Sequence, residues 1–426
     1  MAERITSLDA IEILDSRGNP TIRVFLSLTG GKTVSAAVPS GASTGQHEAH
    51  ERRDRDASRY NGMGVLNAIA SVRDDIAPVL VGRDPTDQGA IDDRMCTLDG
   101  TPNKTRLGAN AILGVSMAVA RAGAFATGLP LYRYFAPSQS YFHLPVPMLN
   151  VINGGLHAAN ALDFQEFMLV PHGAPTFAEA MRLGSETYHA LRAILATRNL
   201  VTAVGDEGGF APDISDNSEA CSLILRAIER AGFQPMSEVA LALDPAASSF
   251  GSASSYDLSK SGGGNLGTNG LIDLYDSWLG RFPIVSIEDG VAEDDWAGYT
   301  EMTRRLGKRI QIVGDDNYVT NVKFIERGIR EKCTNAVLIK PNQIGTVSET
   351  IAAIELCRNA GWNAVVSHRS GETDDSFIAD LAVGLSCGQI KSGAPCRGER
   401  LAKYNRLIEI EHELGKYAVF VSPFGS

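Results

Sequence analysis

The sequence predicts an α/β protein in which a TIM-type (β/α)8 barrel follows a smaller α+β domain. In the second part of the chain, short apolar runs rich in β-branched residues each end in a polar residue and precede a segment with helical spacing of apolar residues. These units recur at intervals near the roughly 31 residues expected when about 250 residues form eight units. A length of 426 residues suits two domains.

The N-terminal part has the pattern of an antiparallel meander followed by helices. Residues 5–38 alternate β-rich stretches with turns at residues 18–20 and 30–31. Residues 107–122, LGANAILGVSMAVARA, are apolar nearly all round and rich in Ala, which predicts a buried helix. Turn-forming residues near 128–138 mark a boundary. We therefore expect an α+β domain over residues 1–135 and a barrel over residues 140–426.

The strands of the predicted barrel are recognised by the polar residues at their ends. These residues are Asp244, Glu288 with Asp289, Asp315, Lys340, His368 and Lys391. Intervening segments at 294–306, 321–332 and 346–360 carry apolar residues at helical spacing, so the units read as βα repeats of a parallel barrel. In such barrels the C-terminal strand ends face the active-site mouth. The polar residues should therefore converge on one pocket.

Two short motifs resemble ligand-binding signatures, and neither is expected to bind a ligand. Residues 251–270 are rich in Gly and Ser and predict a flexible loop. A dinucleotide site would need a strand before this G-x-G-x-x-G pattern and a helix after it, and the Gly/Ser-rich composition favours a linker over such a site. The histidines of HEAH at residues 47–50 are three positions apart, whereas the zincin motif requires four.

Composition restricts the classes of partner and compartment. No apolar run appears long enough to cross a bilayer, and the N-terminus has no apolar core of a secretory signal, so we expect a cytoplasmic protein without a membrane role. The six cysteines form no C-x-x-C pair and are expected to be reduced thiols. The net charge of −11 comes from dispersed acids, and without a basic stripe nucleic acid is not expected as a partner.

Three acidic strand ends predict a metal site. Asp244, Glu288 and Asp315 offer hard oxygen ligands without histidine or cysteine, which favours Mg²⁺ over zinc. A single strand-end acid more commonly pairs with a Lys or Arg. Three acids together favour a metal site over separate ion pairs, because gathering three anions without a cation costs several kcal/mol of repulsion and desolvation.

Two lysines should face the same pocket from its other side. Lys340 and Lys391 either neutralise the acids, or one of them is held near a metal and a second cation, loses its proton and acts as a base. Arg369 and Ser370 offer a guanidinium fork and a hydroxyl suited to phosphate or carboxylate. A structural salt bridge is the alternative for Arg369.

Further carboxyl groups and two glycine-bearing loops complete the candidate site. Glu207, in GDEGGF, and Glu166, at the close of the run ALDFQEF, could share a proton and serve as a general acid, although each alone is an ordinary turn or capping acid. The loops at residues 40–45 and 153–160 have a composition suited to mobile lids that exclude water, or to plain surface turns.

The order of these motifs resembles that of the enolase family over nearly the whole chain. The motifs are ILDSRGNPT, SGASTG, LGANAILGVSMA, LPVPMLNVINGG, GDEGGFAPD, SIEDG, GDD, KPNQIGT and SHRSGET. The resemblance implies a small α+β capping domain, a modified (β/α)8 TIM-type barrel, a homodimer, and reversible dehydration of 2-phosphoglycerate, a small phosphorylated carboxylate, to phosphoenolpyruvate.

The resemblance also implies a role for each site residue. Lys340 would be the base, and Glu207, supported by Glu166, would be the acid that helps the hydroxyl leave. Asp244, Glu288 and Asp315 would bind the first, structural Mg²⁺, and Ser43 with the substrate phosphate would complete a second, catalytic Mg²⁺ site. The residues expected around the substrate are His157, Gln165, His368, Arg369, Ser370 and Lys391.

Several positions depart from the family pattern without removing a chemical group of the site. Leu156 stands where Ser is usual before the lid histidine, and Pro341 follows the predicted base where Val is usual. Ala159, Ser249, His50 and Arg52 also differ. These departures keep open a specialised paralogue, such as the enolase-like proteins that form carboxyphosphonoenolpyruvate. A non-catalytic binding protein is a third possibility, against which the complete set of acids and lysines argues.

Overall fold

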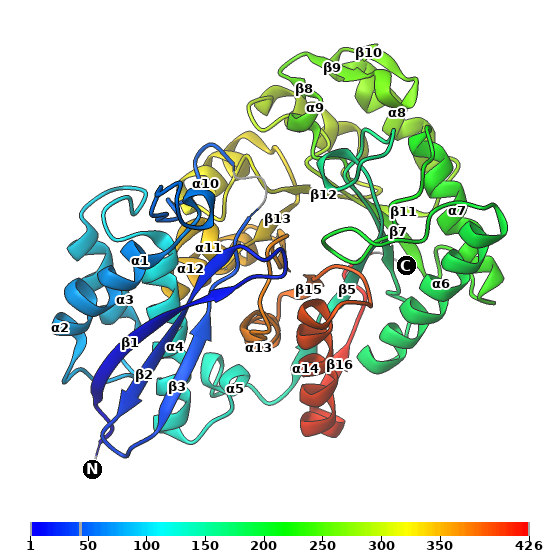
Figure 1. Cartoon of the computed structure of the whole chain (residues 1–426). Coiled ribbons are helices and arrows are strands. Elements are labelled where there is room, and N and C mark those ends of the chain that lie inside the picture. The colour runs from blue at the N-terminus through cyan, green and yellow to red at the C-terminus, as the bar shows by residue number, and fades with distance from the viewer. Residues whose placement is uncertain (1, 42–44, 425–426) are drawn as a thin grey trace.

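The structure is a computed structural model, and it describes residues 2–41 and 45–424. Figure 1 shows the N-terminal elements lying beside a barrel formed by the rest of the chain. The predicted meander is confirmed: β1 (Ile5–Leu14), β2 (Pro20–Leu28) and β3 (Thr33–Ala37) form an antiparallel sheet in that order. The helical elements that follow are α1 (Leu66–Ala70), the π-helix η2 (Ser71–Ile76), α2 (Ala77–Leu80), α3 (Gln88–Asp99), α4 (Ala109–Thr127) and α5 (Leu131–Phe135).

The predicted buried helix is α4, which packs on β2 and β3. Among the described residues α4 is long and apolar enough to cross a membrane, contrary to the expectation from the sequence, but 83% of that stretch is buried inside the protein. Burial on this scale is typical of a core helix. The tight contact of Gly114 with Val24 allows the helix to approach the sheet closely.

The second part of the chain forms a closed eight-stranded barrel, as predicted. The strands follow one another around it in the order β11-β12-β13-β14-β15-β5-β6-β7. Their bounds are β5 (Val146–Asn153), β6 (Glu166–Val170), β7 (Ala240–Asp244), β11 (Ile284–Glu288), β12 (Gln311–Gly314), β13 (Ala336–Ile339), β14 (Asn363–Ser367) and β15 (Gly388–Lys391).

The expectation of an entirely parallel barrel is wrong for β6, which pairs antiparallel with both β5 and β7. The connection between β5 and β6 contains the short 3₁₀ turn η3 (Gly155–His157) in place of a crossover helix. A parallel return normally needs such a crossover, so the chain returns in the opposite direction. As a result Glu166 begins β6 instead of closing a strand, and it lies opposite Asp244, the last residue of β7.

Helices cover the outside of the barrel. The helices of this part of the chain are α6 (Phe177–Thr197), α7 (Asn217–Arg230), α8 (Thr268–Leu279), α9 (Trp296–Leu306), α10 (Val322–Glu331), α12 (Val347–Asn359), α13 (Phe377–Gly384) and α14 (Gly398–Leu414), with the short α11 (Pro341–Ile344) at the mouth after Lys340. Helices α9, α10 and α12 confirm the predicted helical segments. Each begins after a side chain that accepts a hydrogen bond from the first turn, namely Asp295, Asn321 and Thr346.

The predicted flexible loop at residues 251–270 is instead a small antiparallel sheet. It consists of β8 (Gly251–Ser252), β9 (Ser255–Leu258) and β10 (Gly264–Leu266), in the order β10-β9-β8. Tyr256 and Leu258 are buried, and the Tyr256 hydroxyl donates a hydrogen bond to Asp295 at 2.8 Å. These two side chains, at alternate positions of β9, stabilise the sheet despite its Gly/Ser-rich composition, because each buries apolar area.

The C-terminal segment closes the end of the barrel opposite the predicted active-site mouth. β16 (Ala418–Phe420) pairs with β4 (Phe142–Leu144), and Phe420 and Phe424 pack against apolar side chains inside the barrel. Each of the six cysteines is a free thiol, as expected.

Candidate active site

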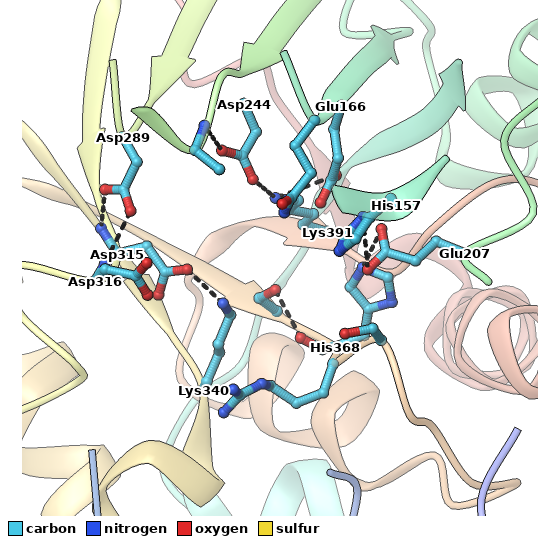
Figure 2. Close-up of a pocket in the computed structure, with 15 residues that line it drawn as sticks. His157, Glu166, Glu207, Asp244, Asp289, Asp315, Asp316, Lys340, His368 and Lys391 are labelled. Atoms are coloured by element: carbon cyan, nitrogen blue, oxygen red, sulfur yellow. Dashed lines mark hydrogen bonds and ion pairs between the residues drawn. The ribbon is translucent and has the colours of Figure 1, made fainter. Parts of the chain in front are cut away.

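The predicted strand-end residues converge on one pocket at the mouth of the barrel (Figure 2). The residues that line it are His157, Gln165, Glu166, Glu207, Asp244, Ala246, Asp289, Asp315, Asp316, Lys340, Ser367, His368, Arg369, Ser370 and Lys391. Glu288 is buried directly behind Lys391. Ser43 lies outside the described residues.

Lys391 connects three acids from three strands. Its Nζ donates to Asp244 Oδ2 at 2.8 Å and to Glu288 Oε1 at 2.9 Å, and it lies 3.2 Å from Glu166 Oε2. These four side chains are nearly inaccessible to solvent. Burial opposes the charge of Lys391, but the neighbouring acids outweigh it and hold the pKa of Lys391 well above its usual value.

Lys340 pairs with the acid at the end of the adjacent strand. Its Nζ donates to Asp315 Oδ2, and the other Asp315 oxygen accepts a hydrogen bond from Gln343 at 2.8 Å. Burial opposes the charge, yet the contact with Asp315 raises the pKa of Lys340. Both lysines therefore neutralise acids in this arrangement, which is one of the two alternatives predicted for them from the sequence.

The three predicted metal acids are close enough to interact. Burial raises the pKa of Glu288 well above its usual value, and the charges of Asp244 and Asp315 raise it further. Glu288 Oε2 is buried without a hydrogen-bond partner among the described residues. An all-oxygen set with an unsatisfied carboxylate oxygen fits a hard cation such as Mg²⁺.

Two neighbouring acids extend this set. Asp289 and Asp316 place carboxylate oxygens within 4.8 Å of one another and of Asp315. Burial and the nearby acids raise the pKa of Asp289 to about 7 and that of Asp316 well above its usual value. Asp289 accepts hydrogen bonds from Tyr299 and from the backbone of residues 315 and 316, so it holds the end of β12 in place. Asp316 was not among the residues predicted from the sequence, although the doubled acid of GDD pointed to it.

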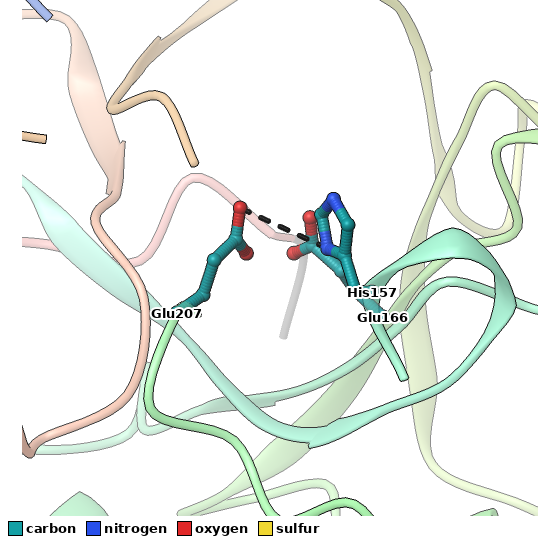
Figure 3. Close-up of side chains that lie close together, drawn as sticks. All are labelled: His157, Glu166 and Glu207. Carbon is teal, nitrogen blue, oxygen red and sulfur yellow. Dashed lines mark ion pairs between the residues drawn. The ribbon is translucent and has the colours of Figure 1, made fainter. Parts of the chain in front are cut away.

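Across the pocket, His157, Glu166 and Glu207 form a second group (Figure 3). Burial and the charge of Glu207 raise the pKa of Glu166 well above its usual value. Burial also opposes ionisation of Glu207, but His157, Arg400 and Lys391 outweigh it and hold the pKa of Glu207 well below its usual value. Glu207 Oε2 also accepts a hydrogen bond from Asn150 at 3.0 Å. A proton shared by these two carboxyl groups is therefore favoured on Glu166 over Glu207.

The segment after β14 brings a guanidinium to the pocket. Arg369 donates to both carboxylate oxygens of Glu48, at 3.0 and 3.1 Å, and to Asn342 Oδ1 at 3.0 Å. Burial opposes its charge, but Glu48 raises the pKa of Arg369. Glu48 comes from the N-terminal part of the chain, so this ion pair joins that part to the barrel mouth. Glu48 was not predicted as a site residue, and in the sequence it stands out only within the HEAH motif.

The comparisons with known proteins agree over almost the whole chain. The model of the enolase N-terminal domain matches residues 5–135, and that of the enolase C-terminal TIM barrel domain matches residues 141–423. Enolase 1 of Methylococcus capsulatus is 57% identical over 99% of this chain and 100% of its own length. The chain belongs to the enolase family. The enolase of Desulfotalea psychrophila is 55% identical and enolase 2 of Pseudomonas syringae pv. syringae 54% identical, over 99% of this chain and 100% and 98% of their own lengths.

Two departures from the enolase pattern have distinct structural settings. Leu156 is 72% exposed in the turn η3, so its side chain takes no part in the core. Pro341 is buried at the first position of α11, where proline is favoured because its nitrogen needs no partner and its φ suits a helix. Neither residue displaces a charged group of this enolase-type site.

Proposed function

We propose that the chain is a magnesium-dependent lyase that catalyses the reversible dehydration of 2-phosphoglycerate to phosphoenolpyruvate. The observation that carries this proposal is one pocket in which two lysines and a set of acids face a second pair of carboxyl groups. The 57% identity to enolase 1 of Methylococcus capsulatus, over 99% of the present chain, supports the same reaction.

Lys340 is the group that takes the proton from the carbon beside the substrate carboxylate. A lysine with a pKa near 10 faces a carbon acid roughly 20 units weaker, a gap of more than ~25 kcal/mol. Lys391 places a second, buried positive charge where negative charge develops on the carboxylate, and such a preorganised charge acts in a site of low dielectric.

Asp244, Glu288 and Asp315 would hold Mg²⁺, and Ser43 with the substrate phosphate would complete a second site. Cations bound there would supply positive charge to the substrate carboxylate. The carboxylates that would hold the cations accept hydrogen bonds from Lys391 and Lys340 in this structure.

The opposite wall of the pocket handles the leaving hydroxyl and orients the substrate. Glu207 and Glu166 act as a pair in proton transfer to the hydroxyl, with His157 3.8 Å from Glu207. The residues that surround the remaining groups of the substrate are Gln165, His368, Arg369 and Ser370. A guanidinium and a hydroxyl suit the phosphate. We place the enzyme in the cytoplasm, in glycolysis, and as a homodimer.

The experiment follows the absorbance of the enol product from 2-phosphoglycerate and Mg²⁺. We expect turnover by the wild type and a loss of about 10²- to 10⁴-fold in Lys340→Ala, because the base is removed. Lys323→Ala, on the exposed side of α10, is the matched control and should keep wild-type turnover.

Absence of turnover by a wild type that binds Mg²⁺ would reject 2-phosphoglycerate as the substrate. It would direct the search to the substrates of the phosphonate pathway, for which the exposed Leu156 beside His157 is the relevant difference. Absence of Mg²⁺ binding would reject both reactions.

A further inference from the structure

One fully buried arginine outside the predicted site joins two of its segments. Arg400, in the first turn of α14, has 0% exposure. Its Nη1 lies 2.6 Å from His368 Nδ1 and donates to the carbonyl of Arg369 at 2.5 Å. Its Nη2 donates to the carbonyls of Asp206 at 2.9 Å and Ser370 at 2.7 Å. A single guanidinium thus holds the loop that carries Glu207 against the segment that carries His368.

The contact with His368 determines where the imidazole carries its proton. A guanidinium has donors alone and stays charged in proteins. His368 Nδ1 must therefore accept, and in the neutral ring the proton then sits on Nε2. Nε2 lies 3.7 Å from Glu207 Oε2, on the side of the ring that faces the pocket.

The surroundings also keep this imidazole neutral. The His368 side chain is 2% exposed. Burial lowers the pKa of His368 well below its usual value, and the positive charges of Arg400, Lys391 and Lys340 lower it further, against the opposing charge of Glu207. The ring is thus a neutral donor of one N–H bond, in a direction set by the guanidinium behind it.

We propose that Arg400 is a positioning residue that fixes His368 as the tautomer protonated on Nε2, with its N–H directed into the pocket beside Glu207. Its importance for turnover rests on the proposed function. The assignment of the His368 tautomer does not rest on the proposed function, because the tautomer is a property of the free protein. Arg400 acts through His368 and the carbonyls it binds, since it does not line the pocket itself.

The first test reads the tautomer directly in the full-length wild type. Protein with ¹⁵N-labelled histidine rings is examined by long-range ¹H–¹⁵N correlation, and the His368 signals are assigned by their loss in His368→Gln. We expect a protonated Nε2 and an unprotonated Nδ1 at neutral pH. A ring protonated on Nδ1, or on both nitrogens, would overturn the proposal.

The second test changes the guanidinium. In Arg400→Met, His368 loses the donor to Nδ1, so we expect both tautomers to appear and kcat to fall about 100-fold, the order seen when one oriented donor is lost. Arg400→Lys retains the positive charge but has one ammonium group in place of the guanidinium fork. Its kcat and its mixture of His368 tautomers should therefore lie between those of Arg400→Met and those of the wild type. The control is Arg406→Lys, on the same helix but paired with Asp380, which should keep both the wild-type spectrum and kcat.

The outcomes separate this proposal from the proposed function. A wild type without turnover on 2-phosphoglycerate rejects the reaction, whereas its His368 spectrum still decides the tautomer. A folded Arg400→Met with the single wild-type tautomer and kcat within about twofold of the wild type would overturn the positioning role. If Arg400→Met does not fold, by circular dichroism, the wild-type spectrum and Arg400→Lys decide.

Discussion

Replacing Lys391 by Met removes the positive charge shared by three buried acids. Its Nζ lies 2.8 Å from Asp244, 2.9 Å from Glu288 and 3.2 Å from Glu166. Removing one partner of a buried ion pair costs about 3–5 kcal/mol, and three acids sharing one lysine place Lys391→Met near ~5 kcal/mol. An unfolding entropy of about 2.1 cal/mol/K per residue gives roughly 0.9 kcal/mol/K for 426 residues, so Tm should fall by about 5–6 °C.

The same substitution should make stability more dependent on Mg²⁺. The acids that lose Lys391 include two of the proposed metal ligands, so a cation can take over the missing charge. Free Mg²⁺ at about 100 times its Kd stabilises by ~2.7 kcal/mol, which corresponds to about 3 °C. Scanning calorimetry in EDTA and in Mg²⁺ should therefore show a larger increase of Tm in Lys391→Met than in the wild type.

Lys403 provides the matched control. It is another buried lysine, bound to Glu372 at 2.7 Å, and neither residue lines the pocket. Lys403→Met should lower Tm in EDTA but show the same response to Mg²⁺ as the wild type. Equal responses to Mg²⁺ in all three proteins would refute the assignment of Asp244 and Glu288 to a metal site.

Two further predictions concern stability away from the metal ligands. Arg121 donates to both oxygens of Asp375 at 2.7 Å; burial opposes ionisation of Asp375, but Arg121 outweighs it and lowers its pKa. Because the folded pKa lies below the unfolded value of about 3.9, this stability is present above pH ~4 and is lost as pH falls further. The Tm of Asp375→Asn should be about 2–3 °C below that of the wild type at pH 7, and this gap should narrow as the pH falls below about 4; a constant gap would contradict the ion pair. Tyr256→Phe removes the acceptor of the Ala292 amide and a donor to Asp295, so Tm should fall by about 1–2 °C with turnover unchanged, and an unchanged Tm would show that the small sheet is not held by this hydroxyl.

The sequence predicted the parts of the site that depend on local pattern. Asp315, Lys340 and Lys391 were found because each follows a short buried run, and parallel strands bring such ends to one mouth. The reversal of β6 escaped prediction, since the direction of a strand depends on the length and conformation of its connection. Periodicity does not encode either property.

Residues that act across long sequence separations were also missed. Glu48 reaches Arg369 from the N-terminal part, and Arg400 reaches His368 from the last long helix. Neither lies at a strand end or in a motif with its own chemical signature. Their partners are fixed by the packing of the two parts of the chain, which a single sequence does not reveal.

The central claim, that Lys340 takes the proton beside the carboxylate, is tested most directly by exchange of that proton with solvent. The wild type with Mg²⁺ and 2-phosphoglycerate in D₂O is followed by NMR for incorporation of deuterium at the reacting carbon. We expect exchange in the wild type, retained exchange with little dehydration in Glu207→Gln, and no exchange in Lys340→Ala. Exchange at the wild-type rate in Lys340→Ala would contradict the claim, because another group would then be the base.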